Sequence, residues 1–316
     1  MRSPFTHTGI GEPVAAPPEG DERTLVAAME RAFIDACLVE LGALKPGNVH
    51  IHAVGHGLSV ADFERSALAS APAICAWGAG VGERILGAVE ATRAAVGTNT
   101  NLGIILLAAP LMPALARDGA SLRQRVRAVL ADLTIRDAEL AYRAIRLAAP
   151  AGLGRSAAHD VVDPPTVNLR DAMAAAAGRD RIARQYATGY EDIFTLALPR
   201  LDECLAAGRN EGESASAVHM RLLATFADSH ILRKYGEAEA EDVRARAARL
   251  DRPALWKASA DERRSSLLTF DGWLKAKGCN PGTTADLTVA CLLAHRLGDI
   301  VSRLRVPGPR HSGAGT

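Results

Sequence analysis

Residues 36–63 read ACLVELGALKPGNVHIHAVGHGLSVADF. Up to Glu40 the apolar residues recur at three- and four-residue steps, which is typical of the buried face of a helix. The Pro-Gly pair within Lys45-Pro-Gly-Asn48 ends that helix, because proline disfavours helical backbone in the residue before it. Three histidines follow in a glycine-containing segment. We therefore predict a binding loop, with Lys45 and Asn48 at a rigid corner.

The composition of the whole chain favours helices. Of the 316 residues, 48% are hydrophobic but only 4% are aromatic. Ala, Leu and Arg predominate, and these residues suit packed helices better than sheets. We expect an all-α fold with a single globular domain of roughly 10–14 packed helices at residues 21–303. Residues 1–20 are expected to form a flexible arm and residues 304–316 a flexible tail.

Charge and cysteine content exclude several classes of protein. Lysine plus arginine total 37 against 36 for aspartate plus glutamate, so the formal charge of +1 provides no field for binding nucleic acid. The five cysteines form no CxxC pair, which argues against a disulfide framework and a thiolate zinc site. The apolar run 102–116 contains prolines and is shorter than the roughly 18 residues of a membrane span. We expect a cytoplasmic protein without a secretory signal, and the sequence leaves a homodimer open.

Local signals place many of the expected helices. Ser59 and Asp62 have the spacing of a capping box that opens a helix through about Cys75. The long break at 150–165 is predicted to be a functional loop within the one domain, in which Asp160 and Asp163 form turns. Helical periodicity predicts further helices over residues 81–96, 102–116, 122–133, 137–147, 168–177, 180–198, 215–231, 237–250, 253–277 and 287–297.

Five short motifs occur in a fixed order along the chain. They are Lys45-Pro-Gly-Asn-Val-His50, Asp62-Phe63, Asn99-Thr-Asn-Leu-Gly103, Ala227-Asp228-Ser229 and Asn280-Pro-Gly-Thr-Thr-Ala-Asp286. Together they resemble the triphosphoribosyl-dephospho-coenzyme A synthase family over roughly residues 24–300. The resemblance implies that the 2′-hydroxyl of dephospho-coenzyme A attacks C1′ of the ribose of ATP. Adenine leaves, the triphosphate stays on the transferred sugar, and Mg²⁺ is required.

The chain departs from the citrate lyase and malonate decarboxylase enzymes of that family. Those enzymes read Asn-Thr-His-Lys-Gly or Asn-Thr-His-Arg-Gly where this chain has Asn101 and Leu102. Residues 152–186 are more similar to the branch found in archaea and in bacteria that use methanogen-type one-carbon cofactors. One alternative is therefore a family member that acts on another acceptor in methanopterin- or methanofuran-type cofactor biosynthesis. The other is a nucleotide- or pterin-binding helical protein without turnover.

The implied reaction assigns roles to the residues of these motifs. Displacement at an anomeric carbon needs a base for the attacking hydroxyl and cations for the triphosphate. We expect Glu40 or Asp62 to be the general base. Asp228 and Asp286 are expected among the Mg²⁺ ligands, since Mg²⁺ takes one or two carboxylates together with phosphate oxygens and water. The residues expected to bind substrate or phosphate are Lys45, Asn48, His50, Asn99, Asn101, Arg233 and Lys234.

Several of these residues also have a structural interpretation. Asp62 and Asp286 each follow a Ser or Thr by three residues and can close a capping box. Asn99 can be an N-cap, while Arg233 and Lys234 can complement a helix dipole. Glu40 has fewer such explanations, because an unpaired buried carboxylate costs several kcal/mol.

The histidines of the loop after Asn48 are not expected to bind zinc. His50, His52 and His56 lie in a glycine-containing segment without a fourth ligand at helical spacing. We expect them to be solvated or to face substrate.

Overall fold

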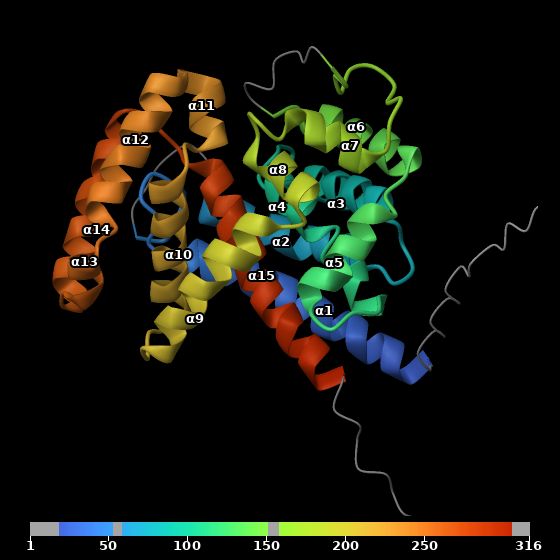
Figure 1. Cartoon of the computed structure of the whole chain (residues 1–316), viewed down its shortest axis with the longest axis horizontal. Helices are drawn as coiled ribbons and strands as arrows, with labels where there is room; N and C mark the ends of the chain where they lie inside the picture. The colour runs from blue at the N-terminus through green and yellow to red at the C-terminus, as the bar shows by residue number, and fades with distance from the viewer. Residues whose placement is uncertain (1–18, 53–58, 151–157, 305–316) are drawn as a thin grey trace, which may run out of the picture.

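The computed structural model of the chain describes residues 19–52, 59–150 and 158–304. Within these ranges the protein is helical and has no strands, which confirms the all-α prediction (Figure 1). The predicted arm and tail lie almost wholly outside the described residues. The elements are α1 (Glu19–Gly42), α2 (Val60–Cys75), α3 (Val81–Val96), α4 (Leu102–Ala108), the 3₁₀ turn η1 (Pro113–Ala116), α5 (Leu122–Ala131), α6 (Ile135–Ala148), α7 (Leu169–Ala176), α8 (Arg181–Thr188), the π-helical turn η2 (Ile193–Ala197), α9 (Leu198–Ala206), α10 (Glu211–Thr225), α11 (Ser229–Tyr235), α12 (Glu237–Leu250), α13 (Pro253–Lys257), α14 (Ala260–Ala276) and α15 (Gly282–Leu304).

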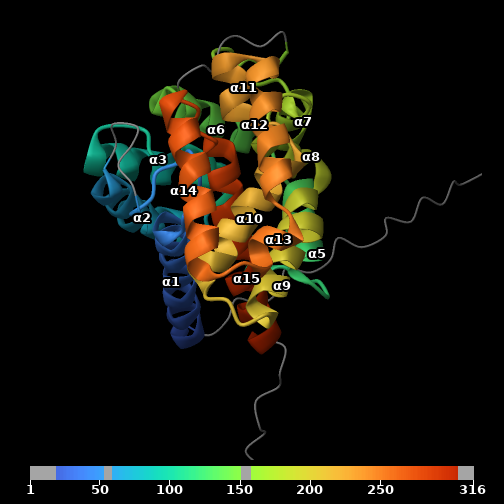
Figure 2. The ribbon, with the colours of Figure 1, turned by 90° about the vertical axis from the view of Figure 1, so that its left-hand side faces the viewer.

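Helix α15 runs through the middle of the molecule (Figure 1). It packs against α1, α4 and α10, and its residues from Leu287 to Leu293 are all buried. Helices α2 to α7 lie on one side of it and α10 to α14 on the other. Figure 2 looks at the second side and shows α12 to α14 as an outer layer over α10. Residues 287–293 of α15 carry no charged side chain, which suits a helix that is buried on most of its surface.

Two clusters of buried apolar side chains form the core. The first includes Phe33 and Ile105 and draws on α1 to α8 and α15, with further residues from η2, α9 and α10. The second includes Met220 and Val243 and draws on α9 to α14. The boundary between them passes just beyond the end of α1, where Ala43 belongs to the first cluster and its neighbour Leu44 to the second. The Lys45 corner therefore lies at the seam between the two clusters.

The starts of several helices are confirmed, but some predicted helices were too long. The expected helix 102–116 ends at Ala108, and a 3₁₀ turn begins at Pro113 because proline cannot continue the α-helical ladder. The helix expected over 180–198 breaks where Gly189 and Tyr190 adopt positive φ values of 66° and 58°. The helix expected over 215–231 breaks at Asp228, which caps α11.

Two further boundaries also differ from the prediction. The helix expected over 253–277 is divided into α13 and α14 by a new cap at Ser259. Helix α15 begins at Gly282, earlier than expected. The described helices include none that combines the length and the hydropathy needed to cross a bilayer.

Candidate active site

A cavity of about 510 Å³ opens at the seam between the two clusters. That volume is typical of a small-molecule site. Its wall combines the end of α1 and the Lys45 corner with Asn99–Gly103, the start of α11 and Asn280–Asp286. Three of the five motifs, far apart in the sequence, thus contribute to one cavity, and Phe63 adds a side chain from a fourth. The motif Ala227-Asp228-Ser229 does not itself line the cavity, but the next residue, His230, does.

Four helices begin at this cavity. Gly103 near the start of α4, Ile182 of α8, His230 of α11 and Thr283 of α15 all line it. The first turn of a helix carries a partial positive charge, although several N–H groups at these helix starts already donate to capping side chains. Because several such ends converge, the cavity is suited to a ligand that carries concentrated negative charge.

A chain of polar contacts runs along the wall formed by the corner. Lys45 is 1% exposed and its ammonium group pairs with the carboxylate of Glu40, which is 6% exposed. The same ammonium donates to Oδ1 of Asn48 at 3.0 Å, and Nδ2 of Asn48 donates to Oδ1 of Asn280 at 2.8 Å. All four residues line the cavity. The buried glutamate predicted on the apolar stripe of α1 therefore has a cationic partner, as its burial requires.

Burial shifts the titration of these groups. Burial raises the pKa of Glu40, and the charge of Lys45 opposes that rise. Burial lowers the pKa of Lys45, and Glu40 opposes that fall. The pKa of Asp286 lies well above its usual range because of burial and the nearby carboxylates of Glu40 and Asp228, against the opposing charge of Arg233. Asp286 therefore holds its proton more tightly than an ordinary carboxyl group does.

Asp286 lies directly against Gly103. A Cβ atom placed on Gly103 would be 2.0 Å from Oδ2 of Asp286 and 2.8 Å from Cδ1 of Ile182. No side chain fits there without moving the carboxylate. The glycine that ends the Asn99–Gly103 motif is thus explained by the aspartate that ends the Asn280–Asp286 motif.

Arg233 lines the cavity, and its guanidinium group pairs with Oδ2 of Asp180 at 2.7 Å. The other oxygen of Asp180 caps α8, since it accepts from the backbone N–H of Ile182 at 2.9 Å and of Ala183 at 3.0 Å. Asp180 therefore links the start of α8 to α11 at the rim of the cavity.

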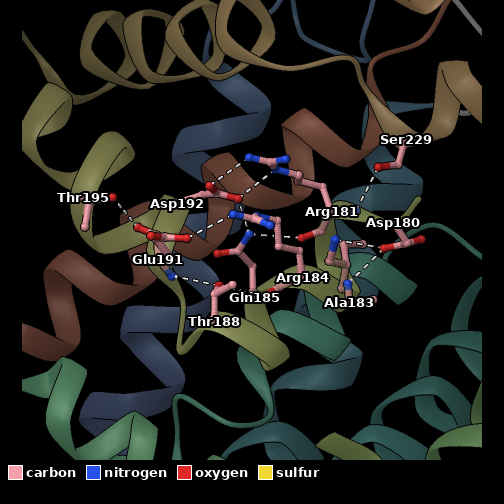
Figure 3. A network of polar contacts seen from close by, with 11 residues as sticks. Asp180, Arg181, Ala183, Arg184, Gln185, Thr188, Glu191, Asp192, Thr195 and Ser229 are labelled. Carbon is pink, nitrogen blue, oxygen red and sulfur yellow. Dashed lines mark hydrogen bonds and ion pairs between the residues drawn. The ribbon is translucent and has the colours of Figure 1, made fainter. Parts of the chain in front are cut away.

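A polar network behind the start of α8 strengthens this link (Figure 3). The carboxylate of Asp192 accepts hydrogen bonds from Nε and Nη2 of Arg181 at 2.9 and 3.0 Å, and from Nε2 of Gln185 at 2.6 Å. The backbone N–H of Arg181 donates to Oγ of Ser229 at 2.9 Å, and its guanidinium group lies 4.0 Å from the ring centroid of Phe226. The network holds α8, η2 and α11 in one arrangement.

The opposite part of the cavity is mainly apolar. Leu106, Ile145, Val161 and Met173 line it, with Tyr142 donating to the backbone oxygen of His159 at 2.8 Å. The predicted turn at Asp160 is confirmed, because its Oδ1 accepts from the N–H of Val162 at 3.0 Å. Asp160 also lines the cavity, which the sequence did not indicate.

Five of the predicted site residues do not line the cavity, namely Asp62, His50, Asn101, Lys234 and Asp228. Asp62 closes the capping box of α2 with Ser59 and contacts Arg65 at 2.6 Å, so its structural interpretation is confirmed. His50 is buried against Asp271, and Lys234 lies over the ring of Tyr235. Asn101 accepts from Oγ1 of Thr92 at 3.0 Å and faces α2 and α3.

The remaining predictions are placed as follows. Asn99 lines the cavity, and its Oδ1 accepts from the N–H of Leu102 at the start of α4 at 3.1 Å, while Asn101 occupies the N-cap position. The role of Asn99 in binding substrate stays a prediction. The oxygens of Asp228 accept from the N–H groups of His230 and Ile231 and from the N–H and hydroxyl of Thr284. Asp228 thereby joins the starts of α11 and α15, and its predicted role as a Mg²⁺ ligand stays a prediction. His56 lies outside the described residues.

Sequence reasoning missed Arg179, Asp180 and His230 as cavity residues. Asp180 and His230 lie at helix starts, and only His230 directly follows a quoted motif. Within the described ranges no group of three or more His, Cys, Asp or Glu side chains has an arrangement that could hold a metal ion by itself.

Comparison with known proteins was made at three levels. The family model for ATP:dephospho-CoA triphosphoribosyl transferases, CitG, matches residues 26–303. A crystal structure of a candidate triphosphoribosyl-dephospho-CoA synthase from Archaeoglobus fulgidus is similar, with a TM-score of 0.56 and 23% identity over 74% of this chain and 97% of that one. At this identity the likeness supports the fold alone. A search of curated proteins gives no match.

Proposed function

The chain belongs to the family of ATP:dephospho-CoA triphosphoribosyl transferases, and we propose that the cavity at the seam is where ATP and dephospho-CoA react. The family match favours this transferase over the one-carbon acceptor and over a binding protein without turnover. The observation that carries the proposal is the chain of contacts from Glu40 through Lys45 and Asn48 to Asn280, which lies on the wall of a cavity that faces four helix starts.

The triphosphate occupies the polar part of the cavity. Lys45, Arg179 and Arg233, which line the cavity, supply positive charge, and the dipoles of the helices that begin there add to it. Asn48 and Asn280, which line the cavity, bind the ribose hydroxyls through their amide groups in this proposal. The adenine lies against the apolar wall that contains Leu106, Ile145 and Met173.

Glu40 is the general base in this proposal, because it faces the cavity whereas Asp62 does not. Its carboxylate takes the proton of the 2′-hydroxyl as the bond from that oxygen to C1′ forms. The bond from C1′ to the adenine nitrogen breaks, and its electron pair leaves with adenine. Lys45 holds the Glu40 carboxylate in place, and its charge opposes the rise in the pKa of Glu40 that burial causes.

The residues around Asp286 fit Mg²⁺. Glu40 and Asp228 raise the pKa of Asp286, and this excess of negative charge is what a divalent cation relieves. Mg²⁺ needs only one or two protein carboxylates when phosphate oxygens complete its coordination. Asp286 is the ligand that faces the cavity, and the cation would neutralise the charge of the triphosphate.

The test is to incubate the protein with ATP, Mg²⁺ and dephospho-CoA and to measure adenine release and the mass of the product. We expect Glu40→Gln and Lys45→Met to lower the rate of adenine release by at least about 100-fold, since general bases contribute roughly 10²–10⁴-fold. Glu90→Gln is the matched control, because Glu90 pairs with Arg143 on the surface, and its rate should equal that of the wild type. No adenine release by the wild type would refute the reaction, and full activity of Glu40→Gln would refute the assigned base.

A further inference from the structure

The Lys45 corner is held from behind by helix α14. Asp271 of α14 is 2% exposed and does not line the cavity. Its Oδ1 accepts from the backbone N–H of Gly47 at 2.8 Å and lies 3.2 Å from Nε2 of His50. Its Oδ2 lies 3.0 Å from Nζ of Lys275. One buried carboxylate thus contacts the corner at two points, Gly47 between Lys45 and Asn48, and His50 two residues beyond Asn48.

The contacts of His50 define which ring nitrogen carries its proton. The backbone N–H of His52 donates to Nδ1 of His50 at 3.1 Å, so Nδ1 acts as an acceptor. In the neutral ring the proton is then on Nε2, which donates to Asp271. Burial lowers the pKa of His50 and favours this neutral form, against the opposing effect of Asp271.

Asp271 is correspondingly held in its ionised form. Burial raises its pKa, but the donors His50, Gly47 and Lys275 outweigh that effect and bring the pKa below its usual value. The carboxylate is therefore a permanent acceptor for the corner over the ordinary pH range.

The backbone of the corner is also packed tightly against the end of α14. Gly47 has a φ of 79°, and a Cβ atom there would lie 2.8 Å from Cδ1 of Leu274 and 2.9 Å from the backbone oxygen of Cys279. Asn280, the next residue after Cys279, holds the side chain of Asn48. The same segment of chain thus fixes both the main chain at Gly47 and the side chain at Asn48.

We propose that Asp271 and His50 are positioning residues, which hold the corner so that Lys45 and Asn48 face the reacting groups. This inference rests on the proposed roles of Lys45 and Asn48. Neither Asp271 nor His50 lines the cavity, so neither contacts substrate. A displacement of about 1 Å at a reacting group can cost roughly 100-fold in rate, and the contacts of Asp271 at Gly47 and His50 lie within two residues of Lys45 and Asn48.

The test compares two aspartates with buried side chains, one that contacts the Lys45 corner and one that contacts residues away from it. Asp271→Asn keeps the shape of the side chain but removes the charge and places an N–H₂ group among three donors. Asp251→Asn is the matched control, because Asp251 is also buried and accepts from Nε of Arg221 at 2.8 Å and Nε1 of Trp256 at 2.6 Å, away from the corner. We expect kcat for adenine release to fall by about 10- to 100-fold in Asp271→Asn and to change by less than about twofold in Asp251→Asn.

A second pair of variants tests the contact between Asp271 and His50 by changing His50. His50→Ala removes the donor to Asp271, whereas His50→Gln keeps an N–H donor close to the position of Nε2. We expect His50→Ala to lower kcat at least tenfold and His50→Gln to restore most of the loss, although both lose the acceptor for the N–H of His52. If Asp271→Asn does not fold, as judged by circular dichroism, the two His50 variants decide the question.

The outcomes separate this inference from the proposed function. No adenine release by the wild type would refute the proposed function itself, and full activity of Lys45→Met would refute the role of Lys45 on which this inference rests. An inactive Lys45→Met together with wild-type kcat in Asp271→Asn and His50→Ala would overturn only the positioning role. Equal losses of kcat in Asp271→Asn and Asp251→Asn would overturn it as well, because they would report lower stability alone.

Discussion

Gly103 is the position at which one added methyl group should disturb the site most directly. In Gly103→Ala the new Cβ would overlap Oδ2 of Asp286 at 2.0 Å. The carboxylate is the end of a side chain and can rotate away, so the fold should persist while the carboxylate leaves its place. We expect the rate of adenine release to fall by at least about tenfold, with the thermal midpoint measured alongside.

The matched control for this variant lies on the helix that carries Asp286. A Cβ atom on Gly298 of α15 has no neighbouring atom within 4 Å. Gly298→Ala should therefore keep full activity and raise the free energy of unfolding by roughly 0.5–1 kcal/mol, because alanine loses less backbone entropy in a helix. Full activity of Gly103→Ala would show that the position of Asp286 does not matter for turnover.

A second prediction at this scale concerns His219 of α10, which is fully buried. Neither of its ring nitrogens has a hydrogen-bond partner among the described residues. Burial and the nearby charge of Lys45 lower its pKa to about 3. The unfolded chain binds a proton there near the ordinary pKa of about 6.5, so between about pH 6.5 and 3 the unfolded state binds more protons.

Stability should therefore fall as the pH drops through that window, by up to about 1.4 kcal/mol per pH unit for this one group. His219→Leu removes the group and should flatten the pH dependence of the free energy of unfolding. Urea titrations of both proteins at pH 7, 5 and 4 measure this pH dependence. An unchanged slope in His219→Leu would show that other groups cause the acid sensitivity.

The sequence indicated some site residues and not others for a physical reason. Glu40 could be recognised because a carboxylate on an apolar stripe requires a partner, and Lys45 lies close to it in sequence. The orientation of the Asn101 side chain could not be predicted, because the hydrogen-bond partners that turn it away from the cavity come from α2 and α3. Asp180 and His230 reach the cavity only through the packing of α8 and α11, which no local pattern encodes.

At the scale of elements, some helix boundaries could likewise be predicted from the local sequence and others could not. The start of α2 was predictable because Ser59 and Asp62 form the whole capping box within four residues. The break between α8 and η2 was not, because Tyr190 is held there by donating to the backbone oxygen of Leu107 at 2.7 Å, a residue of α4. Boundaries made by local hydrogen bonds can be read from sequence, whereas those made by tertiary contacts cannot.

The network of Asp192 makes a prediction about α8 as an element (Figure 3). Asp192→Ala would leave the mostly buried guanidinium group of Arg181 without its two carboxylate contacts. We expect the free energy of unfolding, measured with urea, to fall by about 3 kcal/mol, because removing one partner of a buried ion pair leaves the other charge uncompensated. Because the start of α8 lines the cavity, the KM for ATP should rise as well.

Glu191→Ala is the control from the neighbouring position. Glu191 pairs with Arg184 on the surface, where 46% of its side chain is exposed. Exposed pairs contribute less than about 1 kcal/mol, so this variant should be close to wild type. Equal losses of stability in the two variants would mean that the contacts of Asp192 do not anchor α8.

At the scale of the whole molecule, the cavity lies beside two clusters that share α9 and α10 but otherwise draw on different helices. Leu106, Ile145 and Met173 belong to the first cluster, whereas Lys45 directly follows Leu44 of the second. A ligand that reaches from the apolar wall to the corner therefore contacts both sides. Its binding energy opposes separation of the two halves along the seam, in addition to the contacts of α15 with both.

We accordingly expect calorimetry to show one unfolding transition, and ATP with Mg²⁺, added without an acceptor, to raise its midpoint. Binding to the folded state alone adds about 2.7 kcal/mol at a ligand concentration of 100 Kd. Lys45→Met should lose most of that shift, because the ligand would no longer hold the corner. If two transitions appeared and ATP moved only one, the clusters would unfold independently and the cavity would belong to one of them, since a ligand bound across the seam must couple both.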